Sequence, residues 1–159
     1  MLYIQMLSNF ELLDMGRTYK VSIDEVLFKN DIKQIKIKQN MNVIVNLQSN
    51  SQTAKGTHWT LFLKRGKETL FWDSFGGITP PDIIQYSKPY VKGYNAYTIQ
   101  DLKSDRCGSF CFALLHFLSR NKGKLFPLVN EFVNFFEDDT KKNDNILRKY
   151  FENNDMVLK

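Results

Sequence analysis

The stretch that decides the fold runs from Arg106 to Arg120 and reads RCGSFCFALLHFLSR. It contains no proline and is apolar on most sides, which predicts a buried helix. Cys107 lies at the start of this helix, where backbone N–H groups lack intrahelical partners and the positive end of the helix dipole favours an anion. A cysteine in such a position carries more thiolate than an ordinary one, and the thiolate is the nucleophilic form. The helix start therefore predicts Cys107 as a nucleophile.

Two aromatic and aliphatic runs lie upstream, at residues 58–63 and 69–73, separated by the turn sequence KRGK at residues 64–67. This pattern predicts a β-hairpin. If the turn is centred between its second and third residues, His58 lies directly opposite Asp73 on one face, with Cβ atoms about 4.5–5.5 Å apart. A carboxylate there would orient the imidazole and stabilise the imidazolium, as in a nucleophilic triad. On the hairpin alone, a surface ion pair at the end of a strand is the plainer interpretation.

Further candidates lie just before the helix start and within the helix itself. Gln100 precedes Cys107 by seven residues, and its amide together with the Cys107 backbone N–H would form an oxyanion hole. Gly108 would let a substrate backbone approach closely and leave its own amide free to donate. Cys111, one turn further in, and His116, inside the apolar run, are predicted to be buried core residues.

The remaining sequence completes an α+β pattern. Ser22 and Glu25 match a capping box, which predicts a short helix through Leu27. The order of helix, strands and then helices predicts one α+β domain over residues 1–159, with a small mixed sheet packed against helices. Further strands are predicted over residues 41–47 and 94–99, and further helices over residues 81–84, 126–136 and 146–151.

Length and composition restrict the class of protein. The 159 residues, of which 43% are apolar, suit one folded domain. The longest apolar run, Phe110–Leu118, is far shorter than the roughly 20 residues that cross a bilayer. The N-terminus lacks the basic start and apolar block of a signal peptide. Two cysteines are too few for a disulfide scaffold and fit a reducing compartment. We therefore expect a protein that is neither secreted nor embedded in a membrane.

Other chemistries find less support in the sequence. It contains no Gly-rich phosphate loop and no zinc-ligand spacing, so no metal site is expected. The 22 Lys and Arg residues against 17 Asp and Glu residues leave a net charge of +5. Such a charge can attract phosphate backbones without sequence preference. Solvated surface lysines are the plainer interpretation of this charge.

The candidate residues together resemble a known family. The pair His58-Trp59, the stretch FWDSFG at residues 71–76, Gln100, and CGSFC at residues 107–111 are similar to the adenain and ubiquitin-like-protein protease group of cysteine peptidases. That group has the chain order His, acid, Gln, Cys. Its nucleophile starts a central helix, and its sheet carries the His and the acid. The viral branch is the more similar one, with adenovirus-type maturation proteases and relatives in virophages and large DNA transposons.

The resemblance implies a role for each residue. Cys107 would be the nucleophile, His58 the general base and acid, Asp73 the orienting acid and Gln100 the oxyanion donor. Trp59 would pack beside the site and line the substrate cleft.

The resemblance also implies a biological role. The chain would be a monomeric cysteine endopeptidase that cleaves capsid precursor proteins during particle maturation, in the virion and the host cytoplasm. One alternative is a protease that acts on ubiquitin or related modifiers. Another is an inactive member of the group that binds DNA or capsid.

The same resemblance suggests how activity is controlled. The adenovirus enzyme is activated by a capsid-derived peptide through a disulfide, with DNA as a second cofactor. This chain has no third cysteine for such a bond. We therefore expect no required cofactor, and we retain DNA or a non-covalent capsid peptide as an activator candidate.

Overall fold

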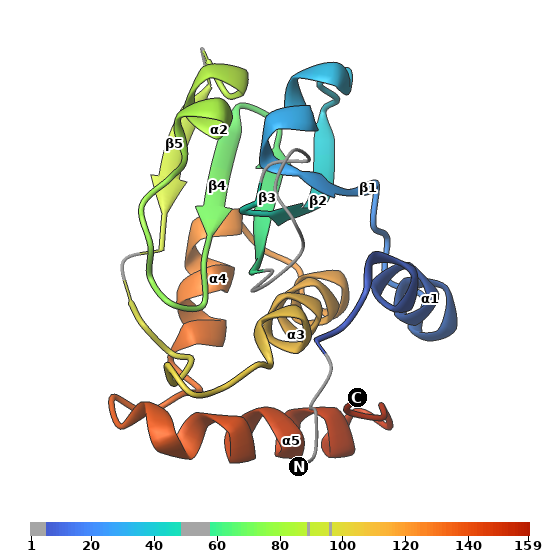
Figure 1. Cartoon of the computed structure of the whole chain (residues 1–159), viewed down its shortest axis with the longest axis vertical. Helices are drawn as coiled ribbons and strands as arrows, with labels where there is room; N and C mark the ends of the chain where they lie inside the picture. Colours follow the sequence, from blue (N-terminus) through green and yellow to red (C-terminus); the bar gives the residue numbers. More distant parts are fainter. Residues whose placement is uncertain (1–5, 49–57, 89, 96) are drawn as a thin grey trace.

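A five-stranded mixed sheet forms the centre of the protein, with helices on both of its faces (Figure 1). The computed structural model describes residues 6–48, 58–88, 90–95 and 97–159. The strand order is that of the sequence, and only the two outermost pairs are parallel. The elements are α1 (Asn9–Tyr19), β1 (Glu25–Phe28), η1 (Lys29–Gln34), β2 (Asn40–Asn46), β3 (Trp59–Arg65), β4 (Glu68–Trp72), α2 (Pro81–Tyr86), β5 (Val91–Tyr94), α3 (Cys107–Arg120), α4 (Leu125–Val133), η2 (Thr140–Lys142) and α5 (Asn143–Asn153).

Helix α3 is the core helix that the sequence predicts. Every residue from Cys107 to Phe117 is buried, because α3 packs against β3 and against α1, α4 and α5. Side chains of β3 alternate between the two faces of the sheet. Leu61 and Leu63 join the core around α3, whereas Phe62 belongs to a second core under α2 and η1. The predicted α+β class and the central buried helix are therefore confirmed.

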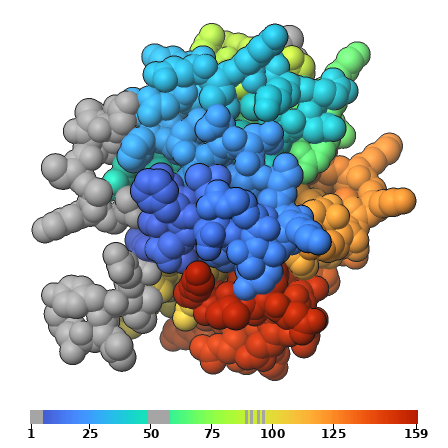
Figure 2. Space-filling model, turned by 90° about the vertical axis from the view of Figure 1, so that its right-hand side faces the viewer, coloured from blue at the N-terminus to red at the C-terminus, as the bar shows by residue number. Residues whose placement is uncertain are grey.

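The N-terminal region differs from the prediction. Residues 25–28 form β1, parallel to β2, and not the end of a helix. Asp24 accepts a hydrogen bond from the Asn42 backbone at 2.7 Å, which ties this segment to β2. The predicted helix was wrong because a local capping pattern cannot outweigh pairing with a neighbouring strand. A capping box does occur at Ser8 and Glu11, where it starts α1, a helix that sequence analysis missed. Figure 2 shows this side of the protein, with α1 in dark blue between the β1–η1 region and α5.

The hairpin register is shifted from the prediction. Arg65 pairs with Glu68, so the two-residue turn is Gly66-Lys67, and its centre lies one residue further along. Gly66 has a φ of +58°, which glycine adopts without strain. His58 is therefore not directly opposite Asp73. Moving the turn centre by one residue shifts the partners by two positions, which keeps both side chains on the same face.

The strand predicted at residues 94–99 was largely wrong. Strand β5 ends at Tyr94, because Asn95 turns the chain: its side-chain oxygen accepts from the Tyr97 backbone at 3.2 Å. The other predicted strands and helices are confirmed, with ends that differ by a few residues. Among the residues that the structure describes, no helix is long and apolar enough to cross a membrane.

Candidate active site

His58 and Asp73 meet at the edge of the sheet where β3 begins and β4 ends. The Nε2 atom of His58 lies 2.6 Å from Oδ1 of Asp73, and both side chains are largely buried. The His58 ring also lies against the Phe75 ring, with centroids 4.6 Å apart. The predicted contact therefore exists, although the two residues are diagonal neighbours and not directly opposed.

The Asp73 carboxylate is held by backbone N–H groups of the loop that follows β4. Phe75 N–H donates to Oδ1 at 2.8 Å, and Gly77 N–H donates to Oδ2 at 3.2 Å. The side chain of Asn95 donates to the Asp73 carbonyl at 3.0 Å. A Cβ on residue 77 would collide with Oδ2, so any side chain here would have to displace the Asp73 carboxylate. Sequence analysis missed Gly77 and Asn95; the paired glycines after DSF were the only local signal for the former.

Cys107 is the first residue of α3 and is 1% exposed. The Trp59 backbone N–H donates to its sulfur at 3.4 Å. The N-cap residue of α3, Arg106, makes no side-chain capping hydrogen bond, so its side chain does not occupy the backbone N–H groups of the first turn. The Cys107 side chain also lies close enough to the His58 ring to raise the pKa of His58. Because Asp73 uses Nε2, the ring nitrogen on the Cys107 side is Nδ1.

The charge state of His58 follows from these neighbours. Burial lowers the pKa of His58, but the hydrogen bonds and negative charges of Asp73 and Cys107 outweigh burial and raise the pKa from 6.5 to about 9. The ring is therefore protonated at neutral pH. An imidazolium beside a sulfur favours the thiolate, which is the form that attacks a carbonyl carbon.

Gln100 is fully buried beside the residue that follows Asp73. Its Oε1 accepts from the Ser74 hydroxyl, and its Nε2 donates to the Ser104 carbonyl at 2.9 Å. The backbone N–H groups of Ile99 and Gln100 both donate to the Ser74 carbonyl, at 2.9 and 3.0 Å. An amide nitrogen carries two hydrogens, and Ser104 accepts one of them. The role of Gln100 as oxyanion donor stays a prediction. Ser74 lies in the FWDSFG motif, but no role for it was predicted, and Ser104 was not predicted at all.

Trp59 and Gly108 pack against each other next to the nucleophile. The Trp59 indole N–H donates to the Leu7 carbonyl at 2.8 Å, and Trp59 is buried. A Cβ on Gly108 would lie 3.2 Å from Cδ1 of Trp59 and 3.4 Å from Leu7. Both residues are therefore buried next to Cys107. Their contact with a substrate stays a prediction.

Cys111 and His116 are core residues, as the sequence predicts. The Cys111 thiol donates to the Trp59 carbonyl at 3.4 Å, and burial raises its pKa well above the usual value. His116 contacts the Tyr150 hydroxyl at 2.8 Å; burial and then the charge of Arg120 lower its pKa. At neutral pH, Cys111 is therefore a protonated thiol and His116 a neutral imidazole. Within the described ranges, no group of three His, Cys, Asp or Glu side chains could hold a metal ion.

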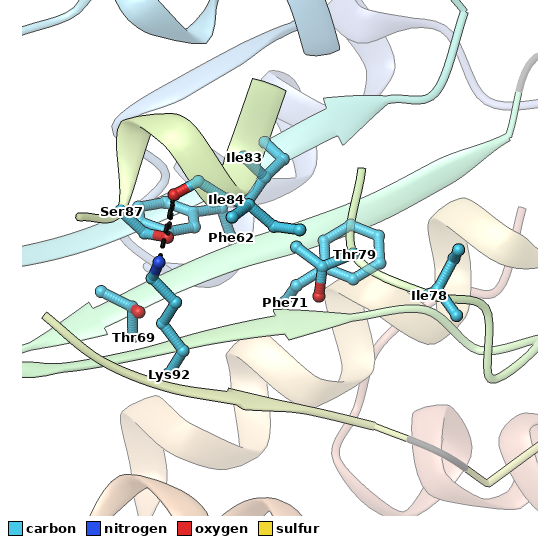
Figure 3. A pocket seen from close by; sticks show the side chains of 9 residues that line it. All are labelled: Phe62, Thr69, Phe71, Ile78, Thr79, Ile83, Ile84, Ser87 and Lys92. Carbon is cyan, nitrogen blue, oxygen red and sulfur yellow. Dashed lines mark hydrogen bonds between the residues drawn. The ribbon is translucent and has the colours of Figure 1, made fainter. Parts of the chain in front are cut away.

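The opposite face of the sheet carries an apolar hollow of about 450 Å³ between α2, β4 and β5 (Figure 3). Phe62 and Phe71 form its floor, and Lys92 crosses it to donate to the Ile84 carbonyl at 3.2 Å. None of the predicted catalytic residues lines this hollow.

Comparison with known proteins supports the fold. No family model and no curated protein matches the sequence. The structure is similar to that of the ASFV pS273R protease, with a TM-score of 0.59 and 14% identity over 97% of this chain and 68% of that chain. The selenomethionine form of that protease gives a TM-score of 0.58 at 15% identity, covering 97% of this chain and 69% of that chain. ChlaDub1 from Chlamydia trachomatis gives a TM-score of 0.51 at 14% identity, covering 94% of this chain and 77% of that chain. The chain therefore has the fold of these proteins.

Proposed function

We propose that this protein is a cysteine endopeptidase. The observation that carries the proposal is His58, whose Nε2 contacts the Asp73 carboxylate and whose pKa is raised by Asp73 and by Cys107, the first residue of a buried helix. An imidazole between an orienting acid and a nucleophile is the arrangement that nucleophilic acyl transfer requires. The likeness to the ASFV protease supports the same conclusion.

In the proposed mechanism, each of these residues has a role in peptide hydrolysis. The Cys107 thiolate attacks the scissile carbonyl carbon, an S–C bond forms, and the carbonyl electron pair moves to oxygen. The Gln100 amide and the Cys107 backbone N–H stabilise this oxyanion. His58 then gives its Nδ1 proton to the leaving amine as the C–N bond breaks and leaves a thioester. Water, deprotonated by His58, attacks the thioester and releases the carboxylate product and the thiol. Asp73 keeps the ring oriented throughout.

We propose capsid precursor proteins as the substrates, cleaved during particle maturation in the virion and the host cytoplasm. The motifs around Asp73 and Cys107 resemble those of the viral branch, and the ASFV protease shares the fold. No step of the mechanism uses a metal or an organic cofactor. A capsid peptide or DNA remains our candidate for an activator. The net charge of +5 is favourable for DNA.

A second candidate substrate is ubiquitin or a related modifier. The shared fold with ChlaDub1 favours this alternative. It predicts cleavage after a Gly-Gly end of a modifier fusion, whereas the maturation protease would cleave a capsid precursor and leave such fusions intact.

Alkylation and cleavage together test the proposal. Purified protein is treated with iodoacetamide across pH, the modified cysteine is identified by peptide mapping, and the wild type is compared with His58→Ala. We expect fast modification of Cys107 near pH 6 that slows in His58→Ala. Cleavage of capsid precursor and of a modifier fusion is then compared between the wild type and Cys107→Ala. A Cys107→Ala protein that still cleaves either substrate would overturn the proposal.

A further inference from the structure

The loop from Ile99 to Arg106 carries Gln100 and leads directly into Cys107. It contains no helix or strand, so contacts from other elements must hold it. An oxyanion donor stabilises a transition state only when it is held at hydrogen-bond distance from the developing charge, and a misplacement of about 1 Å can reduce the rate about 100-fold. The contacts that hold this loop therefore determine how well Gln100 can stabilise the transition state.

The C-terminal region supplies several of those contacts, in addition to the bonds with Ser74 described above. The Asn143 amide, fully buried, donates to the Ile99 carbonyl at 2.7 Å. The Arg106 guanidinium donates to the Lys159 carbonyl at 2.8 Å. These two bonds hold the two ends of the loop against α5 and the residues that follow it.

Ser104 connects this C-terminal support to the oxyanion donor. Its carbonyl accepts from Gln100 Nε2 at 2.9 Å. Its hydroxyl donates to Oδ1 of Asp144 at 2.8 Å, and it accepts from the Arg106 backbone at 3.3 Å. One residue therefore contacts the Gln100 amide, the residue before Cys107, and a carboxylate in the first turn of α5.

We propose that Asp144 is a positioning residue for the oxyanion hole. It acts through Ser104, which it holds where the Ser104 carbonyl orients the Gln100 amide. The inference rests on the proposed peptidase function and assigns a role to α5 within it. The acceptor is a carboxylate, and a hydrogen bond to a charged group is stronger than one between neutral groups.

The test separates oxyanion stabilisation from thiolate formation. Asp144→Ala, Asp144→Asn and a control, Asp138→Ala, are compared with the wild type. Asp138 is exposed and lies in the turn before η2. Peptide cleavage gives kcat and KM. A peptide aldehyde of the same sequence forms a hemithioacetal with Cys107, whose oxygen occupies the oxyanion hole. Alkylation by iodoacetamide forms no oxyanion.

We expect Asp144→Ala to lower kcat about 10-fold with KM unchanged. Aldehyde affinity should weaken by a similar factor, and the rate of alkylation should stay that of the wild type. Asp144→Asn keeps an acceptor oxygen and should recover most of the activity. Asp138→Ala should match the wild type in all three measurements.

Other outcomes distinguish the two proposals. If Asp144→Ala cleaves peptide and binds aldehyde as the wild type does, the positioning role is overturned. If the wild type itself neither cleaves the peptide nor binds the aldehyde, the peptidase function fails instead.

Should Asp144→Ala not fold, Ser104→Ala tests the same bond. It should reproduce the 10-fold loss of kcat with unchanged alkylation, and normal kcat would overturn the proposal. Where both fold, the double variant should lose no more than Ser104→Ala alone, because that change already removes the bond to Asp144.

Discussion

Replacing Asp73 by asparagine tests the contact on which the proposed chemistry depends most. The substitution keeps the size of the side chain but removes its negative charge and turns one acceptor oxygen into a donor. In the native site, burial lowers the pKa of His58, and Asp73 and Cys107 raise it from 6.5 to about 9. One pKa unit is worth about 1.4 kcal/mol, so the environment favours the imidazolium by about 3 kcal/mol.

Without the Asp73 charge, burial should dominate and lower the pKa of His58 well below 9. The ring would then be largely neutral at pH 7, and its orientation would be lost. We expect kcat/KM to fall on the order of 10³-fold. Alkylation of Cys107 near pH 6 should slow to the rate of an ordinary thiol.

Two measurements check this prediction. The rate of Cys107 alkylation is followed from about pH 5 to about pH 10, and the His58 ring is titrated by proton NMR. The chain has two histidines, so the His58 signal is the one that disappears in His58→Ala. Asp138→Asn is the control, because it removes the same charge from an exposed position. An unchanged titration midpoint and an unchanged alkylation profile in Asp73→Asn would refute the reasoning.

Three further predictions follow from the same contacts. Because the pKa of His58 is raised in the folded state, its stabilising contribution should be complete below about pH 6.5 and disappear as the pH rises through about 9, a loss of at most about 3 kcal/mol. Urea unfolding of the wild type and of His58→Ala at several pH values measures this contribution as a difference in the free energy of unfolding. A difference that does not change with pH would contradict the prediction. Gly77→Ala places a Cβ against the Asp73 carboxylate and should lower kcat/KM at least about 10-fold. Full activity would show that the loop after β4 can move to accommodate the Cβ, and would contradict the prediction. Gly108→Ala presses on Trp59 and should lower the free energy of unfolding by about 1 kcal/mol, and a more stable variant in urea unfolding would disprove this packing.

Local patterns in the sequence were enough to predict the helix and the strands that hold the candidate site residues. The apolar run of residues 107–120 predicts α3 because helix formation depends on residues a few positions apart, and those are all visible in the sequence. Strand β1 could not be predicted this way, since its capping-box pattern is local whereas its pairing with β2 is not. The hairpin register was missed for a related reason: Gly66 can occupy more than one position of a turn, and packing of the strands selects between them.

The sequence by itself determined which side chains carry the proposed reaction and in which order they occur: His58, Asp73, Gln100 and Cys107. Only the tertiary structure decided how they are held. Gly77 and Asn95 position Asp73, and residues 74, 104 and 144 form a hydrogen-bonded chain around Gln100. The physical reason is separation along the chain. The Ser104–Asp144 and Ser74–Gln100 bonds join residues 40 and 26 positions apart, so they form only after folding has brought the loop, the sheet edge and α5 together.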